Sequence, residues 1–271
     1  MSLNLRELRE RHLDRGRPLP KDVERALASD PRPGAGALLQ AIRRQRAKNR
    51  AEGQRLKRML VYERALWSAG VERVAGVDEA GAGPLAGPVA AAAVVLPPGA
   101  RIPEVDDSKK LDQATRERLA DTIRSVSVAW STVLVDPEEI DRLNIYWACI
   151  AAMKRAVQAL RPAPEHVLVD ARPLEGLAVP YEAIVKGDAK SLSIAAASIL
   201  AKTTRDRVMV EFDRRYPGYG FAQHKGYPVP EHRQALEKLG PCPIHRRSYQ
   251  WVRQMLEPPV QREFDFGPIG S

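Results

Sequence analysis

The stretch VAGVDEAGAGPLAGPVAAAAVVLP, residues 74–97, decides the fold of this chain. An apolar run ends in two adjacent carboxylates, Asp78 and Glu79, and a glycine loop at residues 81–87 leads into a second apolar run. Burying a carboxylate without a partner is costly, and a bound divalent cation is a natural compensation. We therefore interpret the stretch as two strands joined by a tight loop, with a functional site where the first strand ends.

Apolar strands alternate with helical segments as far as residue 215, which predicts an α/β fold. The tight loop between the first two strands indicates a mixed sheet rather than a purely parallel one. We expect further strands at 126–135, 166–170 and 181–185, and flanking helices at 112–124, 138–160 and 191–215. Helices at 231–239 and 248–256 would form a C-terminal helical region.

Positive charge is concentrated before the first strand. Residues 1–73 carry 18 Lys and Arg against nine Asp and Glu, whereas residues 74–271 carry 25 of each kind. The densest part is RRQRAKNR, residues 43–50, within a helix expected at 38–67. A basic segment joined to a neutral body predicts a nucleic-acid partner. The alternative is a solvated helix face that only keeps the protein soluble.

The pattern divides the chain into four parts. Residues 1–70 form a basic N-terminal helical extension, in which 1–35 are a short helix and a loose linker. Residues 71–215 form the core, 216–256 the C-terminal helical region, and 257–271 a flexible tail with three prolines.

The composition also indicates in which cellular compartment the protein works. The two cysteines, Cys149 and Cys242, are isolated from CxxC or His-rich spacings, so we expect neither a disulfide framework nor a zinc site. No apolar run reaches the length of a membrane span, and the N-terminus lacks the apolar core of a secretory signal. A cytoplasmic protein without a membrane partner is expected.

Carboxylates end three separate apolar segments, at Asp78-Glu79, Asp170 and Asp188. Strand ends of an α/β sheet converge on one edge, where clustered carboxylates would repel one another unless a cation intervened. Oxygen ligands favour Mg²⁺ or Mn²⁺, and two such ions ~3.5–4 Å apart serve phosphodiester hydrolysis. The alternative is that single carboxylates cap loops or helices, as Asp188 would before the next helix.

Three other segments bear on binding. The glycine run is spaced GxGxxxG and leads into a strand, so it matches neither the Rossmann nor the P-loop pattern. The segment DDSKK, residues 106–110, offers two lysines, although a polar turn before a helix would look the same. The segment YGFAQHKGY, residues 219–227, suits stacking on a sugar or base, or packing of its aromatics onto the core.

Together these motifs resemble the ribonuclease HII family, over about residues 55–256. The resemblance rests on VAGVDEAG, PLAGPVAAAAVVLP, DSKKL, LVDA, KGDAKSLSIAAASILAKTTRDR and YGFAQHKGY, in the order of the family. It implies a ribonuclease H-like fold and Mg²⁺- or Mn²⁺-dependent cleavage of the RNA strand of RNA–DNA hybrids. It also implies incision 5′ to single ribonucleotides in duplex DNA, which leaves a 3′-hydroxyl and a 5′-phosphate.

The resemblance also implies roles for individual residues. Asp78, Glu79, Asp170 and Asp188 match the family's metal-binding carboxylates, which would hold two ions with substrate bound. The backbone of the loop Gly81, Ala82 and Gly83 matches the segment that reads the ribose 2′-hydroxyl. Tyr227 matches the tyrosine that contacts the sugar at the RNA–DNA junction, and Lys109 of DSKK is a further substrate-binding residue.

The chain departs from the family at Ala82, where an arginine is usual, and at Pro228-Val229, where Gly-Thr is frequent. Loss of a forked, charge-assisted contact would cost about 1–3 kcal/mol. The alternative function is therefore a nucleic-acid-binding protein of this fold with weakened catalysis or relaxed junction specificity. Phe264 and Phe266 in the tail leave a polymerase sliding clamp open as a partner.

Overall fold

The computed structural model describes residues 4–257, and the chain divides into two compact units between Arg58 and Met59. The predicted tail, and with it the segment considered for a sliding clamp, lies outside the described residues except for Glu257. No helix within residues 4–257 is both long and apolar enough to cross a membrane.

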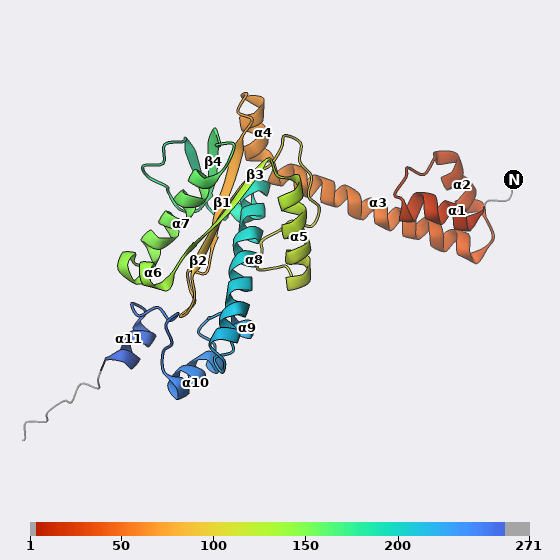
Figure 1. Ribbon diagram of the computed structural model, residues 1–271. Coiled ribbons are helices and arrows are strands. Elements are labelled where there is room, and N and C mark those ends of the chain that lie inside the picture. Colours follow the sequence, from red (N-terminus) through yellow and green to blue (C-terminus); the bar gives the residue numbers. More distant parts are fainter. Residues whose placement is uncertain (1–3, 258–271) are drawn as a thin grey trace, which may run out of the picture. The chain divides into compact units, whose positions relative to one another are not determined.

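The N-terminal unit is a small helical assembly (Figure 1). It comprises α1 (Leu5–Arg9), the π-helical turn η1 (Glu10–Asp14), α2 (Lys21–Ser29) and α3 (Pro33–Met59). The expected loose linker is wrong, because α2 occupies it and buries Leu27 in an apolar cluster with Leu38, Leu39 and Ile42. The basic helical extension itself is confirmed.

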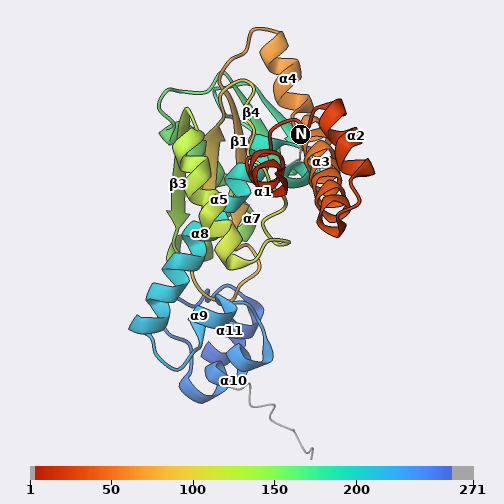
Figure 2. The same ribbon diagram turned by 90° about the vertical axis from the view of Figure 1, so that its right-hand side faces the viewer.

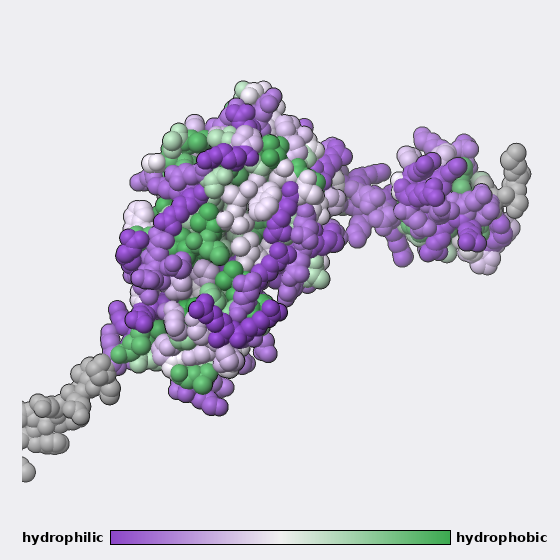
Figure 3. Space-filling view, in the orientation of Figure 1, coloured by the Kyte–Doolittle hydropathy of each residue, from purple (hydrophilic) through white to green (hydrophobic). Residues whose placement is uncertain are grey.

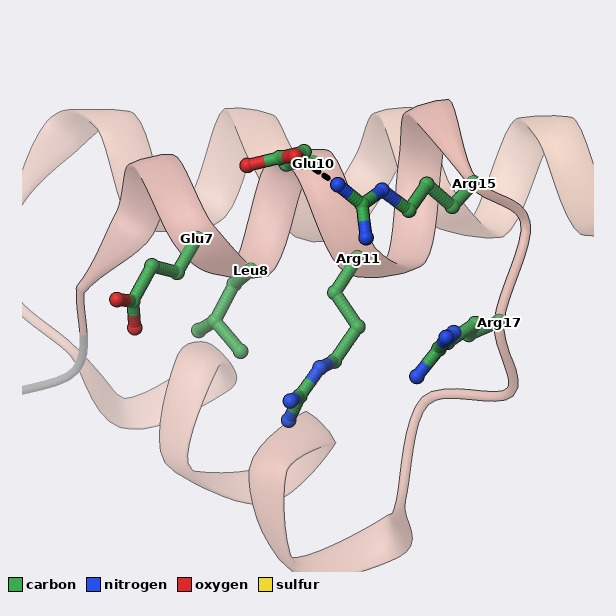
Figure 4. A pocket seen from close by; sticks show the side chains of 6 residues that line it. All are labelled: Glu7, Leu8, Glu10, Arg11, Arg15 and Arg17. Atoms are coloured by element: carbon green, nitrogen blue, oxygen red, sulfur yellow. Dashed lines mark hydrogen bonds and ion pairs between the residues drawn. The ribbon is translucent and has the colours of Figure 1, made fainter.

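Polar side chains cover most of this unit, as Figure 3 shows. A pocket of about 290 Å³ beside α1 and η1 has a lining of mixed charge (Figure 4). Arg11 and Arg17 line it together with Glu7, and Glu10 pairs with Arg15 at 2.5 Å. Two glutamates stand against its three arginines, so the pocket is not a simple anion site.

A five-stranded mixed sheet forms the centre of the second unit, as predicted. The order is β3-β2-β1-β4-β5, in which β1 is antiparallel to β2 and parallel to β4. Figure 1 labels the first four of these strands in chain order. The remaining pairs are β2 with β3, antiparallel, and β4 with β5, parallel. The bounds are β1 Val74–Ala80, β2 Val89–Val95, β3 Ala129–Val135, β4 His166–Asp170 and β5 Tyr181–Ile184.

Helices cover both faces of the sheet. Alternate residues of β1, including Ala75 and Val77, pack in the main apolar cluster with α7 (Ile145–Ala159). The other face meets α8 (Leu192–Arg215), and a Cβ on Gly76 would lie 2.1 Å from the carbonyl carbon of Ser193. Only glycine permits this close approach between strand and helix. α5 (Gln113–Val126) packs against α8, and α4 (Val61–Ser68) contacts β1.

Two predicted helices are each divided. The helix expected at 138–160 is α6 (Pro137–Leu143) followed by α7, because Asn144 adopts a φ of 66°. Asparagine tolerates positive φ and is a favoured N-cap, and its Oδ1 accepts from the N–H groups of Tyr146 and Trp147 at 3.0 and 3.2 Å. The helix expected at 38–67 ends with α3 at Met59, and α4 begins at Val61.

The C-terminal helical region follows α8 and has an apolar cluster of its own. It contains α9 (Phe221–His224), α10 (Pro230–Leu239) and α11 (Gln250–Leu256), gathered beyond the end of α8 in Figure 2. Its cluster includes Phe221 and Leu236, and also Leu85 and Ala86 of the glycine loop. The loop between β1 and β2 is therefore part of the packing of this region.

Candidate active site

Asp78 and Asp170 lie at the ends of two adjacent parallel strands. The register pairs Val77 of β1 with Val169 of β4, so the next residues on the two strands are these two aspartates. Asp188 belongs to a short 3₁₀ turn, η2 (Gly187–Ala189), which precedes α8. The N–H of Gly187 donates to Oδ1 of Asp170 at 2.7 Å, which ties this turn to the end of β4.

A buried glutamate fixes the start of α8 beside this turn. Oε1 of Glu63 accepts from the Ser191 hydroxyl at 2.6 Å and from the Ser193 N–H at 2.9 Å. A carboxylate at a helix N-terminus is favourable because it meets unpaired N–H groups and the positive end of the helix dipole. The position of Asp188, just before this helix, follows from that cap.

The carboxylates repel one another in a poorly solvated place. Asp78 is only 5 % exposed, and burial raises its pKa well above the usual range, with the charges of Glu79 and Asp170 adding to the rise. Burial also raises the pKa of Glu79, and Arg172 opposes that rise. The pKa of Asp188 is raised by burial first and by the charge of Asp170 second. The nearby positive charge therefore does not offset the burial and mutual repulsion of these carboxylates.

Arg172 supplies part of the missing charge. Its Nε donates to Oε1 of Glu79 at 3.1 Å, and its guanidinium lies over the ring of Tyr146, 5.4 Å from the ring centroid. Nothing in the sequence marked this arginine, because it follows the strand that ends in Asp170 and looks like a loop charge.

The donor chemistry of the four carboxylates fits a hard divalent cation. The donors are all oxygens, and a cation would offset the burial and the repulsion that together raise the pKa of Asp78. As the side chains stand, however, no three acidic, histidine or cysteine groups within residues 4–257 are arranged to hold a metal ion. Glu79 is turned to Arg172 instead, so ion binding requires these side chains to rearrange.

Ser198 of α8 contacts the DDSKK segment and also influences Asp78. The hydroxyls of Ser108 and Ser198 lie 3.0 Å apart, and Ser198 opposes the rise in the pKa of Asp78 that burial causes. Lys109 is exposed, and its charge lowers the pKa of Asp188, which places it electrostatically near the carboxylates. The segment forms a turn, as the alternative interpretation expected, but Ser108 within it is buried rather than exposed.

Arg246 is fully buried and holds the glycine loop. Its Nη2 donates to the carbonyl of Gly81 at 2.6 Å, its Nη1 to that of Ala82 at 3.1 Å, and its Nε to that of Gly87 at 3.0 Å. The hydroxyl of Tyr249 also donates to the Ala82 carbonyl. A buried charge needs compensation, and here backbone carbonyl dipoles provide it.

A second buried arginine, Arg205 of α8, joins the glycine loop to the segment that carries Tyr227. Its Nε donates to Pro88 O at 2.9 Å and its Nη2 to Ala86 O at 3.0 Å, while Nη1 donates to Lys225 O at 3.0 Å. Its guanidinium also lies 5.8 Å from the ring centroid of Tyr227. Two segments that are far apart in sequence are therefore held by one side chain.

The structure brings Tyr227 to the glycine loop. A Cβ on Gly83 would lie 3.9 Å from Cε1 of Tyr227, and Tyr227 is 38 % exposed. Tyr219 and Phe221 of the same segment are buried and stack on each other, with ring centroids 5.1 Å apart. The packing interpretation thus holds for these two aromatics, whereas Tyr227 remains accessible.

A directed chain of hydrogen bonds fixes the backbone of Tyr227. Nδ1 of His232 faces the Tyr227 carbonyl at 2.9 Å and so must donate, which leaves its Nε2 to accept from Nε2 of His245 at 3.1 Å. Nδ1 of His245 then accepts from the N–H of Cys242 at 2.9 Å. Burial lowers the pKa of both histidines to about 4, so the chain persists at neutral pH.

Solved structures share this fold. The ribonuclease H2 of Pyrococcus horikoshii OT3 aligns with a TM-score of 0.56 at 29% identity, covering 68% of this chain and 96% of that one. The RNase HII of Archaeoglobus fulgidus, solved in a complex with PCNA, aligns with a TM-score of 0.56 at 28% identity, covering 66% and 95%. A mixed sheet of this topology with carboxylates at its strand ends defines a ribonuclease H, an endonuclease.

Sequence comparisons show which family of ribonucleases H this chain resembles. A model described as ribonuclease HII matches residues 75–252, and one described as ribonuclease HII N-terminal domain matches residues 11–67. The ribonuclease HII of Anaeromyxobacter sp. (strain Fw109-5) is 58% identical over 98% of this chain and 84% of its own length. That of Myxococcus xanthus (strain DK1622) is 55% identical over 94% and 88%. This chain belongs to the ribonuclease HII family.

Proposed function

We propose that this ribonuclease cleaves the RNA strand of RNA–DNA hybrids and incises 5′ to single ribonucleotides in duplex DNA. The products would carry a 3′-hydroxyl and a 5′-phosphate, as ribonucleotide removal and Okazaki primer removal in the cytoplasm require. One observation supports this most directly: Arg205 holds the glycine loop and the Tyr227 segment together in a chain whose carboxylates crowd one edge of the sheet.

The four carboxylates, Asp78, Glu79, Asp170 and Asp188, would hold two Mg²⁺ or Mn²⁺ ions. Such ions, when bound, activate water and stabilise the leaving oxygen. The chain contributes the fixed strand ends for Asp78 and Asp170, and the capped start of α8 for Asp188. Glu79 would leave Arg172 to join the ions.

Recognition of the ribose would fall to the glycine loop. The carbonyls of Gly81 and Ala82 already accept from Arg246, so the loop's N–H groups are the natural partners of a 2′-hydroxyl. Tyr227, exposed beside Gly83, would contact the sugar on the other side of the junction. Lys109 would contact a phosphate near Asp188.

Two further partners belong to this proposal. The N-terminal unit would contact the duplex through exposed cations of α3, namely Arg44, Lys48 and Arg50. A sliding clamp is a candidate partner because the Archaeoglobus fulgidus relative was solved with PCNA.

A cleavage assay tests the proposal. A duplex with one embedded ribonucleotide is incubated beside an all-DNA duplex and an RNA–DNA hybrid, with Mg²⁺, Mn²⁺ or EDTA. We expect metal-dependent cleavage of the hybrid and incision 5′ to the ribonucleotide. Absence of cleavage with either metal would defeat the proposed reaction and favour a binding protein of this fold. Equal cleavage of the all-DNA duplex would defeat the claimed specificity.

A further inference from the structure

Two aromatic side chains at the start of α7 are exposed to solvent. Tyr146 is 41 % and Trp147 is 53 % exposed, and their rings meet edge to face with centroids 5.1 Å apart. The Asn144 cap holds the backbone N–H groups of both residues, so the pair has a fixed base. Rigid aromatic surface that faces water is a common feature of nucleic-acid contacts.

This aromatic pair, Tyr146 and Trp147, is continuous with the carboxylates. Arg172 spans the two, since it lies over the Tyr146 ring and donates to Glu79. Cys149, one helical turn further along α7, responds to the same charges: its pKa is raised to about 12, first by burial and then by Glu79. The first turn of α7 therefore lies beside the catalytic edge of the sheet.

Unused hydrogen-bond donors accompany the rings. Within residues 4–257, the Tyr146 hydroxyl, the Trp147 indole N–H and the two terminal nitrogens of Arg172 make no hydrogen bond that the structure shows. All of these groups are donors that suit phosphate oxygens, and the terminal nitrogens of an arginine suit them as a fork.

We propose that Tyr146, Trp147 and Arg172 form a second nucleic-acid subsite, which takes the sugar–phosphate backbone of the duplex next to the cleaved bond. The proposal rests on the proposed function, because it deepens the same site. The bases of a duplex are paired and stacked, so the accessible partners for the rings are sugar faces. The donors then meet the adjoining phosphates. Contacts of this kind position the duplex and do not distinguish its sequence.

Trp130 provides a matched control. It is 42 % exposed and also has an arginine over its ring, Arg124 at 5.5 Å from the centroid. It lies on the edge strand β3, however, separated from β1 by β2, and makes no described contact with the carboxylates. Its removal deletes an exposed tryptophan without touching the proposed subsite.

The test compares full-length wild type with Y146A, W147A, Y146A/W147A and W130A. Binding is measured in EDTA by anisotropy with labelled hairpin duplexes, one containing a single ribonucleotide and one all DNA, and each closed at one end and open at the other. We expect each subsite substitution to weaken binding of both hairpins roughly three- to thirtyfold. In the presence of Mg²⁺ the KM rises while kcat stays close to that of wild type. W130A behaves as wild type.

Two further readouts separate the outcomes. Duplex binding should quench tryptophan fluorescence in wild type and W130A but not in W147F, and melting temperatures check that each variant is folded. Unchanged affinity of the double variant, with a wild type that binds and cleaves, overturns this proposal alone. The proposal is also overturned if the effect of the substitutions vanishes when both ends of the duplex are closed. That result would mean that the rings stack on the terminal base of the open duplex rather than on its backbone. A wild type that binds neither hairpin in EDTA and cleaves neither the RNA–DNA hybrid nor the ribonucleotide-containing hairpin with Mg²⁺ or Mn²⁺ overturns both this proposal and the proposed function.

Discussion

A Cβ placed on Gly81 would lie 2.1 Å from Nε of Arg205. The first glycine of the loop is therefore required by a buried guanidinium, in addition to its φ of +95°. Because Arg205 also donates to Lys225 O, a side chain at position 81 would disturb the segment of Tyr227 as well as the loop.

The substitution G81A tests this packing. It should lower the free energy of unfolding by about 1–3 kcal/mol, from backbone strain and displacement of the arginine. G83A is the matched control for stability, because a Cβ there meets only the Tyr227 ring, at 3.9 Å. Denaturant unfolding followed by circular dichroism measures both variants. Equal stability of G81A and wild type would contradict the clash.

The two buried arginines should differ in how they couple to Tyr227. Each arginine uses three separate nitrogens to reach three carbonyls, which the single nitrogen of a lysine ammonium cannot span. Each buried carbonyl left unpaired costs about 1–3 kcal/mol, so R205K and R246K should both lower the melting temperature. Arg246 donates to the glycine loop, whereas Arg205 also reaches Lys225 O.

Double-mutant cycles with Y227A resolve that difference. Affinity for a ribonucleotide-containing duplex should show a coupling of about 0.5–3 kcal/mol between R205K and Y227A. The cycle of R246K with Y227A should be closer to additive. Larger coupling for Arg246 than for Arg205 would show that the link between the two segments runs elsewhere.

These arginines mark the limit of what the sequence predicts. The carboxylates were predicted at strand ends because apolar runs stop at Asp78 and Asp170, and such runs are visible without a structure. Arg205 and Arg246 look like surface charges in TTRDR and HRRSY, because their partners are carbonyls, which every residue has. Asn144 sits inside a helical pattern, and only its positive φ reveals the break between α6 and α7.

The substitution A82R tests the departure from the family pattern. Ala82 is partly buried against the main apolar cluster, and its carbonyl is held by Arg246, so the backbone of the loop is already ordered. An arginine there should add a forked phosphate contact and tighten duplex binding roughly tenfold or more. A82K is the control, since an ammonium lacks the fork. No gain in affinity for A82R would remove the phosphate-fork argument.

The histidine chain predicts an acid-dependent loss of stability. The pKa of His232 and of His245 is about 4 in the folded protein, below the ordinary value of 6.5, so the unfolded chain binds more protons between these values. The stability that the neutral rings contribute is present above pH 6.5 and is lost as the pH falls towards 4.

Melting temperatures from pH 7.5 to 5 measure this effect, with H232Q as the comparison, because the raised pKa values of the carboxylates affect both proteins alike. Between pH 7.5 and pH 5 the free energy of unfolding should fall by about 1–2 kcal/mol more in wild type than in H232Q, and the melting temperature should fall further accordingly. Parallel pH profiles for the two proteins would show that His232 does not carry the proton linkage.

The basic face of α3 should contribute a salt-dependent share of duplex affinity. Neutralising Arg44, Lys48 and Arg50 together removes three cations that would each pair with a phosphate, and the slope of log K against log salt should become shallower by about 0.9 for each phosphate left unpaired. R15Q is the control, because Arg15 is already paired with Glu10. Deletion of residues 1–50 should have the same direction of effect. If the triple variant and the truncation both keep the wild-type affinity and salt slope, α3 serves as a solvated helix face and the catalytic unit binds the duplex without it.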